Sequence, residues 1–160
     1  MKEMQQKKGQ KGFSLIELLI VVAIIGIIAA IAIPNLLASR RAANEASAIS
    51  AVRNLSSAEE VYRATLGTGS QFTDMAGLLN QRMIDSSLAS ATTVAKAKSG
   101  YIYSVIASGG GFNFCAGAAP ATINTGTRNF SSDEPGVVYV HPLDIANPPS
   151  STVGGTPLNN

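Results

Sequence analysis

Glu17 is the residue whose placement most needs a chemical explanation, because it stands directly before a long apolar stretch. Residues 18–33 are all apolar or glycine, and the pair Lys11-Gly12 lies five residues ahead of the acid. A charge within a membrane-length apolar segment costs on the order of 1–3 kcal/mol, depending on its depth. A position near an interface relieves most of that cost, so the penalty alone does not decide what Glu17 does.

The other reactive side chains form no catalytic set. His141 is the only histidine and has no orienting acid in a motif, so we interpret it as a surface residue. Cys115 is the only cysteine; we predict a small buried side chain, and no intrachain disulfide can form. Glu59 and Glu60 are adjacent, so they diverge on a helix. The sequence therefore indicates no enzyme.

Asp133 and Glu134 are the only residues that we consider as metal ligands. They precede Pro135 and offer carboxylate oxygens, which suit Ca²⁺. They lack the regular spacing of a calcium loop. We expect no other metal and no other cofactor.

The composition separates the amino terminus from the rest. Four of the twelve basic residues lie within the first eleven positions, so no basic patch elsewhere suggests nucleic-acid binding. We divide the chain into a leader (1–12), a hydrophobic helix (13–34), an amphipathic helix (35–66), an α+β head (67–141) and a Pro/Gly-rich tail (142–160).

Residues 13–66 are predicted to form one long, bent helix. The apolar part is long enough to cross a bilayer, and Pro34 then interrupts the pattern, so we expect a kink or local melting there. Beyond the proline, apolar residues recur at helical spacing and define one buried face. These residues are Ala48, Val52, Leu55, Ala58 and Tyr62.

The remainder predicts short elements. Thr73 or Asp74 can cap a helix that reaches about Ile84, and residues 86–99 are expected to be irregular. Strand patterns start at Gly100, Phe112 and Gly136, with residues 109–111 as the turn between the first two. The fold class is thus α+β, with the long helix packed on an antiparallel sheet of about three strands. The tail is expected to be a loop or loosely held.

Three interpretations of the amino terminus follow. A secretory signal peptide would use Ala30-Ile-Ala32 as its cleavage site, but the helical pattern continues through that point. A single-span anchor with its basic end in the cytoplasm accounts for length and orientation but leaves Glu17 unexplained.

The third interpretation rests on a family resemblance. The stretch Lys11-Gly-Phe-Ser-Leu-Ile-Glu-Leu18 resembles the amino-terminal signature of type IV prepilins and type II secretion pseudopilins. In that pattern a basic leader ends in glycine, a hydrophobic residue and Ser or Thr follow, and a glutamate stands five residues after the glycine. A long apolar segment and a proline at the position of Pro34 complete it.

The resemblance implies a function for each residue of the motif. A membrane prepilin peptidase would cut between Gly12 and Phe13 and methylate the new amino group of Phe13. Glu17 would pair with the Phe13 ammonium of a neighbouring subunit. The protein would be stored in the bacterial inner membrane, among its lipids, with the leader cytoplasmic and the head periplasmic.

From there an assembly platform in the inner membrane would polymerise identical subunits into a helical filament. The favoured reading is a subunit of an extracellular type IV pilus. The alternative is the major pseudopilin of a type II secretion system, which forms a periplasmic filament, and a non-polymerising anchored or secreted protein is more remote. Many type IV pilins close a carboxy-terminal loop with a disulfide, which this chain cannot form.

Overall fold

The computed structural model describes residues 12–158, so the predicted leader lies outside the described residues except for Gly12. Contacts divide the chain into two units, one reaching Leu36 and the other starting at Leu37. Helix α1 (Leu15–Thr65) contributes residues to both. Each unit is described separately below.

Helix α1 carries the first unit and continues through its proline. Pro34 lies inside the helix, so the expected local melting is not seen, while its function as a kink stays a prediction. The helix ends where the amides of Leu66 and Gly67 both donate to the carbonyl of Tyr62. A Cβ at Gly67 would lie 2.0 Å from the carbonyl oxygen of Gln71, so only glycine fits this turn.

The second unit contains a five-stranded antiparallel sheet in the order β1-β2-β3-β4-β5. Its first two strands form the predicted hairpin, with Tyr101 opposite Pro120 and Ser108 opposite Asn113. The expectation of about three strands was too low, because β3 and β5 carry no strand pattern, and the third predicted strand begins later than expected. The strands are β1 (Tyr101–Ser108), β2 (Asn113–Pro120), β3 (Asn129–Ser132), β4 (Tyr139–His141) and β5 (Thr156–Pro157).

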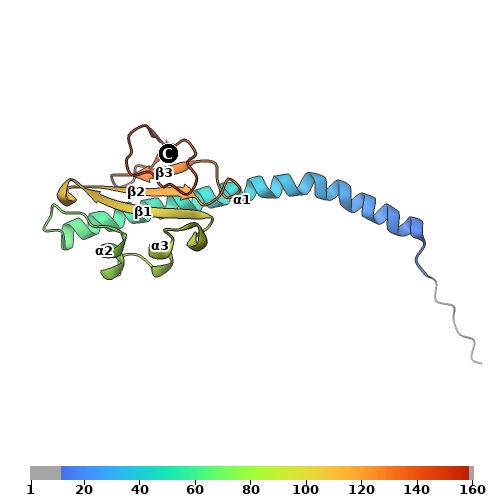
Figure 1. Cartoon of the computed structure of the whole chain (residues 1–160), viewed down its shortest axis with the longest axis horizontal. Helices are drawn as coiled ribbons and strands as arrows, with labels where there is room; N and C mark the ends of the chain where they lie inside the picture. The colour runs from blue at the N-terminus through green and yellow to red at the C-terminus, as the bar shows by residue number, and fades with distance from the viewer. Residues whose placement is uncertain (1–11, 159–160) are drawn as a thin grey trace, which may run out of the picture. The chain divides into compact units, whose positions relative to one another are not determined.

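The core forms where the second half of α1 lies along the sheet, as Figure 1 shows. The predicted helical stripe is confirmed: Ala48, Val52 and Leu55 are fully buried. They pack in one cluster with residues of the sheet, among them Tyr103 and Phe130. The α+β prediction, a long helix packed on an antiparallel sheet, is therefore confirmed.

Two short helices connect α1 to the sheet. Asp74 caps α2 (Met75–Asn80) as predicted, since its side chain accepts from the amide of Gly77, but the helix ends before Ile84. Residues 86–99, expected to be irregular, contain α3 (Ser86–Ser90) and a 3₁₀ turn (Val94–Lys96). Asp85 caps α3 through the amide of Leu88. Asp85 is an N-cap residue, but the Ser-rich sequence after it has a low helix propensity, so the sequence does not predict the helix.

The carboxy-terminal segment is held against the sheet, which corrects the expectation of a loosely held tail. Residue Leu158 donates its amide to the carbonyl of Val138, and β5 pairs with β4. The buried side chain of Asn129 donates to the carbonyls of Asp144 and Asn147. The sequence does not predict these contacts, because strand β5 is only two residues long and several prolines interrupt the segment. The contacts depend on distant residues of the sheet rather than on a repeating pattern in the sequence.

Glu45 connects α1 to the loop that precedes β3. It is 7% exposed, and its carboxylate accepts hydrogen bonds from Thr127 and from the guanidinium of Arg128, the shortest at 2.6 Å. Burial alone would raise the pKa of Glu45, but the hydrogen bonds from Thr127 and Arg128 outweigh it and lower the pKa. This buried charge is thus fully compensated.

Glu59 is buried with less compensation. Its side chain has no exposed surface; Oε2 accepts the amide of Thr73 at 3.0 Å, while Oε1 has no partner in the described part of the chain. Burial raises the pKa of Glu59 to about 7, against the opposing hydrogen bond from Thr73. A group whose pKa is raised on folding stabilises the folded state below its unfolded pKa, and this contribution is lost as the pH rises through the folded pKa.

We therefore predict that Glu59→Gln removes a pH-dependent loss of stability. At pH 8 the variant should be more stable than the parent by about 2–3 kcal/mol, with the difference vanishing below about pH 4.5. The measurement is urea unfolding of the full chain in detergent, followed by near-ultraviolet circular dichroism of its tyrosines. Glu134→Gln, the same change at an exposed position that is not among the groups acting on Glu59, is the control and should keep the parent's pH slope. Equal slopes for the parent and Glu59→Gln would contradict the prediction.

Candidate functional site

The start of α1 brings Ser14 and Glu17 into direct contact. Ser14 precedes the first helical residue, and its amide donates to Oε2 of Glu17 at 2.8 Å. The carbonyl of Ser14 accepts the amide of Leu18 at 3.3 Å. This is one half of a capping box, in which an acid three residues into the helix satisfies an otherwise unpaired amide. The S-x-x-E pattern at Ser14 and Glu17 is a sequence signal for this cap.

Glu17 therefore has a local function before any partner arrives. A carboxylate in the first turn is also favoured by the positive end of the helix dipole. The side chain remains solvent-exposed, and Oε1 has no hydrogen-bond partner among residues 12–158. One oxygen thus holds the helix start while the other is open to a second donor.

The peptide bond between Gly12 and Phe13 is accessible. Both residues lie in an exposed segment before the helix, and Phe13 is 92% exposed. A Cβ added at Gly12 would meet nothing within 4 Å, and the backbone there is not left-handed. Packing among residues 12–158 therefore gives no reason for a glycine at this position.

The apolar half of α1 is exposed on all sides within its unit. All of its large apolar side chains between Leu15 and Ile33, thirteen in number, are at least 50% exposed. By length and composition the helix can cross a membrane, and none of its most apolar 18-residue window is buried. A surface of this kind is expected to be covered by lipid or by other protein.

The reactive residues of the head take structural positions. His141 is half-buried rather than on the surface, which corrects that interpretation, and its Nε2 lies 2.6 Å from Oγ of Ser131. Burial lowers the pKa of His141, which favours the neutral ring. Ser131 is fully buried, so no substrate reaches its hydroxyl. The prediction for Cys115 is confirmed: it is buried, and burial raises the pKa of its thiol to about 11.

The calcium candidates are not brought together with further acids. Asp133 is exposed and accepts a hydrogen bond from Thr152, and the carbonyl of Glu134 accepts one from Ser132. Within residues 12–158 no three His, Cys, Asp or Glu side chains gather at one point. The calcium site at Asp133 and Glu134 stays a prediction.

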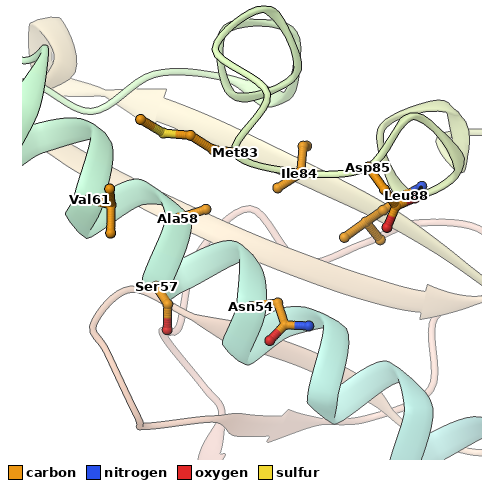
Figure 2. Close-up of a pocket in the computed structure, with 8 residues that line it drawn as sticks. All are labelled: Asn54, Ser57, Ala58, Val61, Met83, Ile84, Asp85 and Leu88. Atoms are coloured by element: carbon orange, nitrogen blue, oxygen red, sulfur yellow. Dashed lines mark hydrogen bonds between the residues drawn. The ribbon is translucent and has the colours of Figure 1, made fainter.

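A groove of about 410 Å³ runs between α1 and the segment that joins α2 to α3. Figure 2 shows Ala58 and Val61 on the helix across from Met83 and Ile84. Asp85 is the only acidic residue of its lining, and it already caps α3 and pairs with Lys98 at 3.0 Å. The groove therefore offers packing surface but no free group for acid–base chemistry.

Comparison with known proteins concerns mainly the amino-terminal third. The family profile described as the prokaryotic N-terminal methylation motif matches residues 7–33. The chain is 48% identical over 56 residues to the type IV wide pilus major component PilA4 of Thermus thermophilus. This match covers 35% of the chain and 43% of that protein.

Other relatives come from both kinds of filament system. The chain is 36% identical over 58 residues to type II secretion system core protein G of Aeromonas hydrophila, covering 36% of the chain and 41% of that protein. It is 39% identical over 72 residues to the type IV major pilin protein PilA of Myxococcus xanthus, covering 45% and 33%.

The chain thus spans less than half the length of these relatives. No solved structure matches. The resemblance to type IV pilins and type II secretion pseudopilins is confirmed for the amino-terminal motif.

The capping geometry predicts different effects for two substitutions of Glu17. Glu17→Ala removes the acceptor for the Ser14 amide, so the first helical turn should lose about 1 kcal/mol and its amides should exchange about fivefold faster. Glu17→Gln keeps an acceptor and should stay close to the parent. Hydrogen exchange of residues 14–18 in detergent measures this, and indistinguishable exchange in the parent and Glu17→Ala would show that the cap has no energetic weight.

Proposed function

We propose that this chain is a structural subunit of a type IV pilus filament. It is made as a precursor, cut between Gly12 and Phe13 by a prepilin peptidase, methylated on Phe13, and polymerised through its amino-terminal helix. The observation that carries the proposal is the exposed apolar half of α1, which follows Glu17 inside a matched methylation motif. In this function the chain is not an enzyme.

The apolar surface of α1 supplies the driving force for assembly. Burial of apolar surface contributes about 25 cal/mol per Å², and full burial of one Leu or Ile side chain about 1.5–3 kcal/mol. In the inner membrane, lipid covers this surface. When the subunit leaves the bilayer, the same helices of identical subunits replace the lipid, and a repeated head-to-tail contact produces an open helical filament.

Glu17 provides the register of that contact. A carboxylate inside a bundle of apolar helices is unfavourable unless an opposite charge lies within hydrogen-bond reach. The α-amino group of Phe13, with an ordinary pKa near 8, is such a charge, and methylation keeps it. Because Oε1 of Glu17 has no partner within residues 12–158, one carboxylate can keep the Ser14 amide and accept a neighbour's ammonium.

Cleavage then acts as a chemical switch for assembly. Before the cut, the nitrogen of Phe13 is part of a peptide bond with Gly12 and carries no charge. Only the processed subunit presents the ammonium that Glu17 requires. The basic leader keeps the amino terminus in the cytoplasm and the head in the periplasm, by the positive-inside rule. An assembly platform in the inner membrane would then extract and add the subunits.

The second candidate is the major pseudopilin of a type II secretion system, with a periplasmic filament. The likeness to core protein G of Aeromonas hydrophila favours it. Deletion of the gene in the native host separates the two: loss of long surface filaments supports the pilus, and loss of protein secretion with surface filaments intact supports the pseudopilus.

Glu17→Gln is the sharpest test of the charge pair. It retains the capping acceptor but removes the negative charge, so filament yield should fall about as far as with Glu17→Ala, while processing at Gly12 continues. The measurement is the amount of filament sheared from cells, with intact mass to verify the processed start at methylated Phe13. If Glu17→Gln assembles normally and Glu17→Ala does not, capping rather than charge pairing explains this residue.

Gly12→Ser should block processing without disturbing the subunit, because nothing within residues 12–158 packs against Gly12. The protein should accumulate with the mass of the uncut chain. Gly26→Ser is the matched control, since Gly26 lies inside α1 with the same open surroundings and should be processed normally. Efficient cleavage of the Gly12→Ser chain would exclude a peptidase that reads this glycine.

A further inference from the structure

A depression of about 400 Å³ lies between the β1–β2 turn and the carboxy-terminal segment, away from the groove of Figure 2. We call it the hairpin pocket. Phenylalanine side chains and a ring of hydroxyl, amide and carboxylate groups line it, which is an unusual mixture for an exposed surface. The phenylalanines are Phe72, Phe112 and Phe114, and the polar residues include Asn113, Asp133 and Thr152.

The first wall of the hairpin pocket is held in place. The ring centroids of Phe72 and Phe114 lie 4.6 Å apart, and the ring planes make an angle of 48°, so the two rings form a packed aromatic pair. The amide of Phe72 donates to the carbonyl of Gly111 at 2.7 Å, which fixes the β1–β2 turn. Phe112, in the same turn, is nevertheless 61% exposed. Its ring therefore contributes little to the core and is available to a ligand.

The opposite wall is fixed as firmly. A Cβ at Gly117 would lie 2.3 Å from the carbonyl oxygen of Pro149, so the carboxy-terminal segment rests directly on β2. The hydroxyl of Thr152 donates to Oδ2 of Asp133 at 2.7 Å and joins that segment to the sheet. Oδ1 of Asp133 has no hydrogen-bond partner in the described part of the chain. The pocket is thus formed before any ligand binds, which reduces the entropic cost of binding.

We propose that the hairpin pocket is a carbohydrate site for a neutral sugar, of one or two units. A sugar ring has an apolar face of C–H groups, which suits an exposed aromatic ring such as Phe112, and a rim of hydroxyls. Asp133 and Asn113 offer a charged acceptor and an amide to those hydroxyls, and hydrogen bonds to a charged acceptor are the stronger kind.

The size and charge of the pocket narrow the ligand. Small-molecule sites commonly enclose about 300–1,000 Å³, and one or two sugar units fit the lower part of that range. The carboxylate of Asp133 repels acidic sugars, so uronic and sialic acids are disfavoured. Polar groups form the larger part of the pocket's exposed lining. An apolar helix is therefore a less suitable ligand than a molecule with many hydroxyl groups.

The test uses the whole protein after removal of residues 1–12, dissolved in a detergent that has no sugar head group. N,N′-diacetylchitobiose and lactose are the neutral probes and digalacturonic acid is the acidic one, each titrated by saturation-transfer NMR. We expect saturable binding of at least one neutral probe and none of the acid. Phe112→Ser and Asp133→Asn should each weaken binding by about tenfold or more, a change of 1.4 kcal/mol.

Ile123→Ser is the control, because Ile123 is 57% exposed but lies outside the pocket. It should bind as the parent does. Asp133→Asn keeps an acceptor for Thr152, so its effect reports the charge rather than a displaced wall. The proposal is overturned if neither neutral probe binds, if either pocket variant binds like the parent, or if the acid binds equally well. If the unmutated protein binds no sugar but forms a dimer that Phe112→Ser disrupts, the pocket is a contact site for a second copy of the chain instead.

Discussion

The exposed apolar half of α1 is the constraint on which the rest of the structure depends. Its thirteen large apolar side chains between Leu15 and Ile33 are at least half exposed. At about 1 to 2 kcal/mol for each partly exposed side chain, leaving them in water would cost roughly 13–26 kcal/mol. This exceeds the net stability of a typical domain, about 5–15 kcal/mol. The helix must therefore be covered by lipid or by other protein, which in the proposed function means lipid first and other copies later, and the head has to fold without it.

The head meets this requirement with a separate core. Ala48, Val52 and Leu55 turn the second half of α1 into one side of that core, and the sheet supplies the other. The buried carboxylate of Glu45 then ties the helix to the loop before β3 through Thr127 and Arg128. Helix α1 thus has an exposed apolar first half and a second half that packs against the sheet. Within residues 12–158, only the second half is buried by contacts with the rest of the chain.

Sequence patterns predicted the elements with strong local signals. The helical stripe, the Asp74 cap and the β1–β2 hairpin follow from spacing, capping chemistry and glycine turns, which act over a few residues. The Ser14–Glu17 cap is equally local and was not predicted, although its S-x-x-E pattern is present in the sequence. Strand β3, with the polar sequence Asn-Phe-Ser-Ser, depends on distant partners, so no local period indicates it. Glu59 lies four residues after Leu55 on the buried face of α1, so its spacing is compatible with burial and only its charge argued against it.

The carboxy-terminal segment shows how a head with a single cysteine holds its last residues. Asn129 is almost fully buried, and its amide contacts both Asp144 and Asn147 at 3.0–3.2 Å. Each such hydrogen bond contributes about 0.5–1.5 kcal/mol, so the set approaches the 2–4 kcal/mol of a typical disulfide. The backbone of Pro149 also packs directly against Gly117 on strand β2, where a larger side chain would not fit. The thiol of Cys115 also donates to the carbonyl of Pro149 at 3.7 Å. With a single cysteine no intrachain disulfide can form, so hydrogen bonds and close packing hold this segment, and the contact of Gly117 with Pro149 also fixes one wall of the hairpin pocket.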